Sequence, residues 1–92
     1  MHVAVRYMAQ LRQAAGTSSE SVALEGPCSV RQLLLRLAER HGRPLRDLLL
    51  DAGGGPQPTV LVFVGDQQVS WETPVTLRDG DQVTVLSPMA GG

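Results

Sequence analysis

Residues 29–42 read SVRQLLLRLAERHG, and this stretch organises the rest of the chain. Ser29 is followed three positions later by Gln32, which is the form of a capping box at a helix N-terminus. The stripe that follows at helical spacing comprises Val30, Leu33, Leu34, Leu37, Ala38 and His41. Gly42 supplies a left-handed stop, and Pro44 prevents the helix from continuing. We therefore predict one amphipathic helix that buries a single face.

The segments before this helix have the period of strands. Large apolar side chains alternate with other side chains over residues 2–8, and again over residues 20–24. Residues 9–15 are rich in helix formers and end at Gly16, which predicts one or two helical turns closed by a glycine. Two strands joined by such a short connection favour an antiparallel pair.

The segments after the helix predict a second short helix and further strands. Residues 43–51 have the composition of a helix, and the glycines and prolines of residues 52–58 predict an exposed, mobile loop. Residues 59–64, TVLVFV, predict a central strand that is buried on both faces. A short strand at residues 69–71 and a last strand at residues 82–86 complete the order. Strands on either side of one dominant helix predict an α+β fold in which the helix covers one face of a sheet.

Length and charge limit the class of protein. The chain has 92 residues, enough for one domain with a single core, and a formal net charge of −1. That charge argues against a domain built chiefly to hold nucleic acid or an anionic membrane. Residues 1–46 hold seven arginines and three glutamates, whereas residues 47–92 hold one arginine and six acids, which hints at a two-faced surface. No stretch approaches the ~20 apolar residues of a membrane span, so we expect a cytoplasmic protein.

The residue types that usually carry chemistry are scarce. Cys28 is the only cysteine, which excludes an internal disulfide and a thiolate metal cluster. The dipole of the following helix could lower the pKa of its thiol, but a loop cysteine without a base is expected to be inert. We expect His2 and His41 to be ordinary surface histidines, and we expect no bound metal or cofactor. No nucleophile, base and orienting group come together in the sequence, so an enzyme is not predicted.

The chain ends in six uncharged residues that follow directly on the last predicted strand, Ser87-Pro88-Met89-Ala90-Gly91-Gly92. Pro88 cannot donate a ladder hydrogen bond and should stop that strand. We therefore divide the chain into a domain of residues 1–86 and a flexible tail of residues 87–92. The two terminal glycines leave the carboxylate of Gly92 without a nearby side chain, so that a narrow partner site could admit it.

Several stretches together resemble the MoaD/ThiS family of sulfur carriers. They are residues 5–12 with Ala15-Gly16, the helix of residues 30–42, residues 60–69, residues 77–83 (LRDGDQV) and the terminal Gly91-Gly92. The resemblance covers essentially the whole chain. It implies a ubiquitin-like β-grasp fold, with a mixed sheet of about five strands packed on one main helix.

The resemblance also implies a chemistry for the tail. A ubiquitin-activating-type adenylyltransferase would use ATP to adenylate Gly92, and sulfur would then convert Gly92 to a thiocarboxylate. Gly91, Ala90 and Met89 would be recognised as the tail enters its partners. The thiocarboxylate would donate sulfur to a second enzyme, with the large subunit of molybdopterin synthase as the first choice. The chain would then be a carried substrate, and a non-catalytic subunit of that synthase.

The resemblance leaves alternatives open. Carriers of the same family serve the synthesis of cysteine and thiamine and the thiolation of tRNA. A protein modifier, in which Gly92 forms an amide with another protein, or a non-covalent interaction module would belong to another class. Partners are expected to dock on the exposed sheet face near the last strand, through residues such as Phe63, Trp71 or Leu86. Of these, Phe63 is expected to lie in the core.

Overall fold

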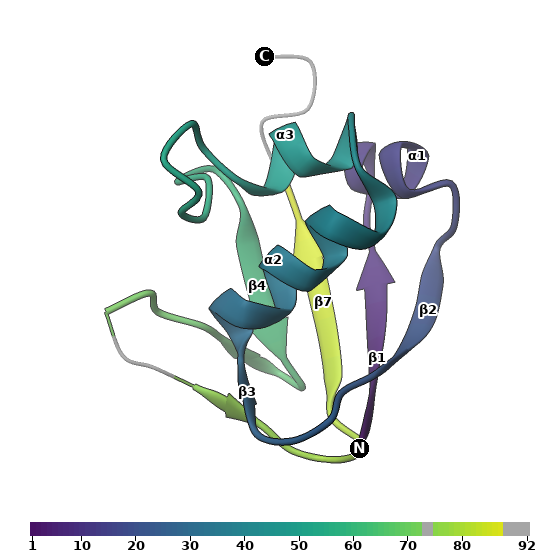
Figure 1. Cartoon of the computed structure of the whole chain (residues 1–92), viewed down its shortest axis with the longest axis vertical. Coiled ribbons are helices and arrows are strands. Elements are labelled where there is room, and N and C mark those ends of the chain that lie inside the picture. The colour runs from purple at the N-terminus through teal and green to yellow at the C-terminus, as the bar shows by residue number, and fades with distance from the viewer. Residues whose placement is uncertain (73–74, 88–92) are drawn as a thin grey trace.

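The computed structural model describes residues 1–72 and 75–87. Figure 1 shows one long helix lying across a sheet, with two short helices at one end of that sheet. The elements follow in this order: β1 (His2–Tyr7), α1 (Gln10–Ala15), β2 (Ser19–Ala23), β3 (Cys28–Ser29), α2 (Val30–His41), α3 (Leu45–Leu49), β4 (Leu61–Val64), β5 (Gln67–Gln68), β6 (Thr76–Leu77) and β7 (Gln82–Leu86). The predicted α+β class is confirmed.

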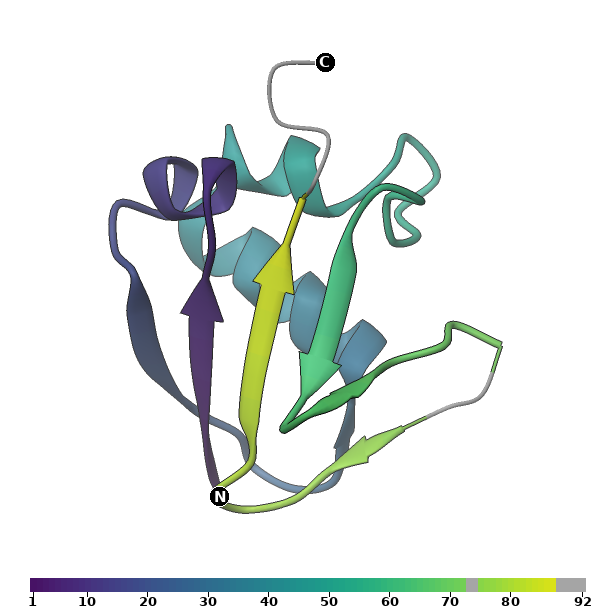
Figure 2. The same cartoon turned by 180° about the vertical axis from the view of Figure 1, so that it is seen from behind.

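The main sheet has five strands in the order β2-β1-β7-β4-β5. Strands β1 and β7 are parallel, whereas the pairs β1–β2, β4–β7 and β4–β5 are antiparallel, so the sheet is mixed. β3 and β6 form a separate two-stranded sheet. Figure 2 shows the main sheet from the side opposite α2, with the yellow β7 between the purple β1 and the green β4. The last strand of the chain therefore lies at the centre of the sheet.

The capping box at the start of α2 is present. The Ser29 hydroxyl accepts a hydrogen bond from the Gln32 N–H at 3.1 Å, and the Gln32 side-chain oxygen accepts one from the Ser29 N–H at 2.9 Å. At the other end, Gly42 has a φ of 68°, and its N–H donates to the Ala38 carbonyl. The helix therefore begins and ends where predicted, although Gly42 combines its positive φ with a ψ of −154° and so does not adopt the predicted left-handed helical conformation.

We expect Ser29→Ala to lower the free energy of unfolding by about 1 kcal/mol, because the N–H of Gln32 would lose its partner. Urea denaturation followed by circular dichroism measures this change. Ser21→Ala is the matched control, since Ser21 is exposed and its hydroxyl makes no hydrogen bond to any residue that the structure describes. An equal loss in both variants would mean that the cap contributes nothing specific.

The core lies between the sheet and the helices. The inward side chains of β1 are Val3, Val5 and Tyr7, and those of β7 are Val83 and Val85; all are at most 1% exposed. Opposite them, α2 buries five of the six residues of the predicted stripe, and α3 adds Leu45 and Leu49. The sixth, His41, is half-buried. None of the helices in the described part of the chain is long and apolar enough to cross a membrane.

Two strand predictions are wrong. The strand predicted to be central and buried on both faces is β4, which lies beside the central β7. Val62 is buried, but Leu61 and Phe63 are half-buried because they belong to the face opposite the helices. The strand predicted at residues 69–71 is instead β5, at Gln67–Gln68. An apolar run alone did not show that only one face of the sheet is covered.

The loop after α3 is held by hydrogen bonds. One carboxylate oxygen of Asp51 accepts from the N–H groups of Gly53 and Gly55, at 2.9 and 3.0 Å. The Gln57 amide donates to two backbone carbonyls, those of Asp47 and Leu50. The glycines and prolines of residues 52–58 predicted an exposed, mobile loop. Residues 52, 53 and 58 are exposed and residues 54–57 are half-buried. The bonds of Gln57 fasten this loop to the end of α3.

Candidate functional site

The central strand leads to the predicted site. β7 ends at Leu86, at the end of the sheet where α1 and α3 lie (Figure 1). Ser87 follows and is only 7% exposed. The predicted tail residues beyond it lie outside the described part of the chain: Met89, Ala90, Gly91 and Gly92. The described structure therefore defines the base of the tail and the surface around it.

Apolar side chains gather on the uncovered face of the sheet beside the end of β7. Leu61 on β4 is paired directly with Leu86 on β7, and Phe63 is paired with Thr84. All four are half-buried. The exposed Met8 follows β1 at the same end of the sheet, where its N–H donates to the Val85 carbonyl at 3.1 Å. We call Leu61, Phe63 and Leu86 the outer patch.

The three residues proposed for partner docking separate in the structure. Phe63 and Leu86 belong to the outer patch, so the expectation that Phe63 lies in the core is wrong. Trp71 is also half-buried, but it packs against the core cluster and lines a hollow of about 240 Å³ beside Val30, Val69 and Val75. Trp71 also lines a second hollow, of about 460 Å³, together with Leu61, so it adjoins the outer patch. Phe63 and Leu86 lie on the two strands beside the base of the tail, whereas Trp71 follows β5.

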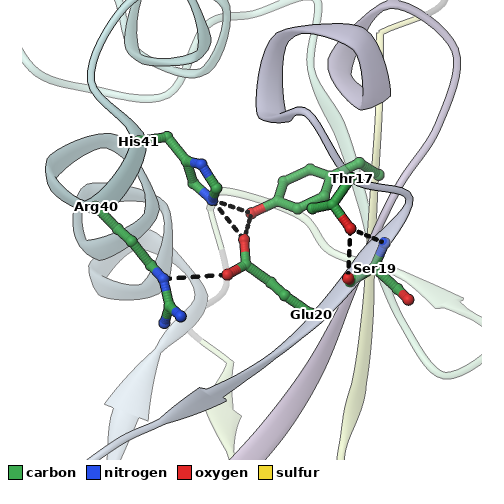
Figure 3. Close-up of polar contacts among 6 residues, drawn as sticks. Thr17, Ser19, Glu20, Arg40 and His41 are labelled. Atoms are coloured by element: carbon green, nitrogen blue, oxygen red, sulfur yellow. Dashed lines mark hydrogen bonds and ion pairs between the residues drawn. The ribbon is translucent and has the colours of Figure 1, made fainter.

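A cluster of polar side chains joins β1, β2 and α2 (Figure 3). The Tyr7 hydroxyl donates to one carboxylate oxygen of Glu20 at 2.6 Å, and His41 Nε2 contacts the same oxygen at 2.5 Å. The other Glu20 oxygen accepts from Arg40 Nε at 3.1 Å. The Tyr7 and His41 rings meet edge to face, with 5.9 Å between their centroids. This polar cluster ties the C-terminal turn of α2 to the sheet.

The cluster changes the acidity of its members. Burial alone would raise the pKa of Glu20, but the hydrogen bonds from Tyr7 and His41 and the nearby positive charges outweigh it and lower that pKa. Burial, followed by the hydrogen bond to Glu20, raises the pKa of Tyr7 far above its ordinary value of 10.0. Glu20 is therefore held as a carboxylate and Tyr7 as a neutral donor.

These shifts predict how stability responds to acid. The folded-state pKa of Glu20 lies below its ordinary value of 4.5, so its stabilising contribution is complete above that pH and is lost as pH falls through the folded-state pKa. We expect Glu20→Gln to lower the free energy of unfolding by about 2 kcal/mol at neutral pH, because charged hydrogen bonds are lost. Urea denaturation across pH measures this, and the gap from the wild type should narrow in acid. The exposed Glu39→Gln is the control, and a gap that does not depend on pH would contradict this account.

The cluster corrects the prediction that His41 is an ordinary surface histidine, because its side chain is only 18% exposed. Sequence reasoning missed the cluster because Glu20 lies 21 positions from His41 and 13 from Tyr7. One signal was available: Glu20 occupies an inward position in the alternation of its strand. A carboxylate at such a position requires partners from the core side.

Cys28 does not have the character of a reactive thiol. Burial raises its pKa, although the charge of Arg36 opposes that effect. The direction of the shift is opposite to the lowering by the helix dipole that the sequence suggested, and the inert role of Cys28 stays a prediction. No group of three metal-binding side chains occurs among residues 1–72 and 75–87.

Comparison with known proteins decides the family. The model of the ThiS family matches residues 5–92, which is nearly the whole chain and includes Gly91 and Gly92. The chain belongs to the ThiS family. No curated protein matches this ThiS-family chain in sequence.

Solved structures of similar proteins share its fold. A putative molybdopterin converting factor, subunit 1, from Pyrococcus furiosus is 29% identical, with 97% of this chain and 99% of that chain covered and a TM-score of 0.76. A chain of the BexX/CysO complex from Amycolatopsis orientalis is 27% identical, with 98% of this chain and 99% of that chain covered and a TM-score of 0.68. SAMP1 from Haloferax volcanii is 20% identical over 100% of both chains, with a TM-score of 0.84.

These likenesses confirm the ubiquitin-like β-grasp fold and the resemblance to MoaD/ThiS sulfur carriers. The ThiS-family chain is thus a member of the ubiquitin-like sulfur carriers and modifiers. In such a protein the outer patch lies on the uncovered side of the sheet, beside the strand that leads to the terminal glycines.

Proposed function

We propose that this chain is a sulfur carrier whose terminal carboxylate, on Gly92, is activated and converted to a thiocarboxylate. The observation that supports this most directly is the family match, which runs through Gly91 and Gly92 to the last residue. The placement of β7 adds to it, because the strand leading to the tail is the central strand of the sheet and provides a rigid base. Met89 and Ala90 would be recognised together with the glycines as the tail enters a narrow channel.

The proposed chemistry takes place in three steps on the partner enzyme. A carboxylate oxygen of Gly92 attacks the α-phosphate of ATP, pyrophosphate leaves, and an acyl-adenylate forms. The terminal sulfur of a persulfide then attacks the carbonyl carbon and AMP leaves. A second thiol cleaves the resulting acyl disulfide, which releases the thiocarboxylate and leaves a disulfide on the donor. The adenylate is needed because an ionised carboxylate is a poor acylating group.

This chain would contribute recognition surfaces to that chemistry. The adenylyltransferase binds and uses the ATP, so this chain acts as a carried substrate with no bound cofactor. The outer patch provides apolar area for docking, beside the strand that carries the tail. We propose that these reactions take place in the cytoplasm.

Among the sulfur pathways, we propose molybdopterin synthesis, with this chain as the small subunit of the synthase. The likeness to the putative molybdopterin converting factor subunit at 29% identity supports this choice. The BexX/CysO complex, one chain of which is nearly as similar, keeps another sulfur-transfer pathway as the alternative. Cysteine synthesis, thiamine synthesis and the thiolation of tRNA are the other pathways that the same carrier chemistry would serve.

Reconstitution tests the proposal. The purified chain is incubated with ATP, a sulfur source and the adenylyltransferase of its own host, and its intact mass is measured before and after. We expect an increase equal to the exchange of one oxygen for one sulfur, and the increase should require ATP. Transfer of that sulfur to the molybdopterin precursor by the synthase large subunit would support the chosen pathway. If no ATP-dependent change of the C-terminus occurs, a non-covalent interaction module becomes the better account.

A protein modifier is the alternative of another class, because its C-terminus undergoes the same first step. It predicts amide adducts on other proteins that survive treatment with thiols. Adducts without any thiocarboxylate would replace the carrier proposal.

A further inference from the structure

The second strand is an open edge of the sheet. Within residues 1–72 and 75–87, β2 pairs with β1 alone. The hydrogen bonds Tyr7 N–H to Ser18 O and Leu24 N–H to Met1 O fix which residues of β2 bond to β1. Because antiparallel bonding alternates, Glu20 and Val22 bond to β1, whereas Ser19, Ser21 and Ala23 direct their N–H and C=O groups away from the sheet.

One of these three outward residues is already satisfied. The Thr17 hydroxyl donates to the Ser19 carbonyl at 2.8 Å and accepts from the Ser19 N–H at 3.4 Å, as Figure 3 shows. No comparable bond reaches the backbone of Ser21 or Ala23 from any described residue. The open part of the edge therefore consists of Ser21 and Ala23, and it begins after the satisfied Ser19.

Natural edge strands are guarded by being short, by charged side chains, by a proline or by a bulge. This edge is short, but it has no charge directed outward, no proline and no bulge. The outward side chains here are Ser21 and Ala23, which are small and uncharged, and the register with β1 is regular. The one charged residue of β2, Glu20, is turned inward and held by Tyr7, Arg40 and His41. The polar cluster thus fixes the strand while leaving its edge free.

We propose that two copies of this chain pair through β2, antiparallel, with Ser21 of each copy opposite Ala23 of the other. In this register every open N–H and C=O of the two residues finds a partner, and the satisfied Ser19 lies outside the paired segment. Val22 of one copy lies opposite Val22 of the other, and Glu20 opposite Leu24, so no like charges oppose each other across the new ladder.

The surface above the edge carries charges of both signs. A hollow of about 380 Å³ lies between β2 and α2, lined by Val22, Ala23, Arg36, Glu39 and Arg40. A copy related by a two-fold axis through Val22 would present the same mixture of charges to this surface, so the pairing does not bring together two surfaces of a single sign. The dimer leaves β7 away from the interface, since β1 lies between β7 and β2. This inference does not depend on the proposed function.

The test is the mass of the full chain in solution. Sedimentation equilibrium from micromolar to millimolar concentration should show a shift from 9.8 kDa toward twice that mass. Hydrogen exchange in the dimer should show slowed amides at Ser21 and Ala23. The outward N–H of Ser21 makes no bond to β1, so Ser21→Pro should abolish the dimer and keep the circular dichroism spectrum. Ala23→Pro provides a second variant of the same kind, should Ser21→Pro fail to fold.

Gln68→Pro is the matched control. The bond from the Val69 N–H to the Val62 carbonyl shows that the N–H of Gln68 points outward from the opposite edge of the sheet. This variant should remain dimeric. A wild-type protein that stays monomeric to millimolar concentration would overturn the proposal. A dimer that survives both proline variants, or that leaves the amides of Ser21 and Ala23 fast to exchange, would also overturn it.

Discussion

Gly92→Val is expected to abolish thiocarboxylate formation, with a loss of at least about 100-fold in the rate of loading. The physical reason is steric: a channel narrow enough to select a chain end without Cβ atoms cannot accept a branched side chain beside the reacting carbonyl. The free energy of unfolding should not change, because the buried residues of the described core end at Ser87. Intact mass after incubation with ATP, sulfur source and adenylyltransferase measures loading, and urea denaturation measures stability.

Gly26→Ala is the control for this variant. No atom lies within 4 Å of the position that a Cβ would take at Gly26, and its backbone does not require glycine. It should therefore load at the wild-type rate. Normal loading of Gly92→Val would remove the terminal glycine from the mechanism.

Replacing Phe63 or Leu86 by Asp is expected to lower kcat/KM for adenylation by about tenfold or more, with no comparable loss of stability. Both side chains are half-buried on the uncovered face of the sheet beside the base of the tail, where a partner would desolvate them. A buried apolar anchor in an interface contributes about 2 kcal/mol or more, and a carboxylate at the same place would have no partner. The effect should appear mainly in KM when docking precedes chemistry.

Gln82→Asp is the matched control for the outer patch. Gln82 is exposed and begins β7, so it belongs to the same strand at the end away from the tail. Its kcat/KM should stay within about twofold of the wild type. If all three variants reacted at the wild-type rate, the docking surface would have to lie elsewhere.

The local patterns that specify backbone geometry were readable in the sequence. The capping box of Ser29 and Gln32, the stripe of α2 and the alternation of β1 each depend on contacts between near neighbours, and each is confirmed. Gly16 closes α1, as predicted, and it does so in the left-handed conformation. These features follow from positions a few residues apart, for which periodicity is sufficient.

Features that depend on contacts between residues far apart in the sequence could not be predicted from periodicity. Phe63 is half-buried because no helix of residues 1–72 and 75–87 covers its face of the sheet, which is a property of the whole fold. The polar cluster needs Tyr7, Glu20 and His41 to meet from three elements, and spacing along the chain does not predict that. For the candidate site, sequence reasoning placed the docking surface near β7 but could not separate the outward Phe63 and Leu86 from Trp71.

The central claim is that Gly92 carries sulfur, and the intact mass of the protein purified from its native host tests it most directly. The account predicts a fraction of molecules heavier by the exchange of one oxygen for one sulfur, with the change located at Gly92 by fragmentation. That fraction should disappear when the gene for the adenylyltransferase is deleted. A C-terminus that remains an unmodified carboxylate in every molecule, with the adenylyltransferase present and sulfur supplied, would contradict the account.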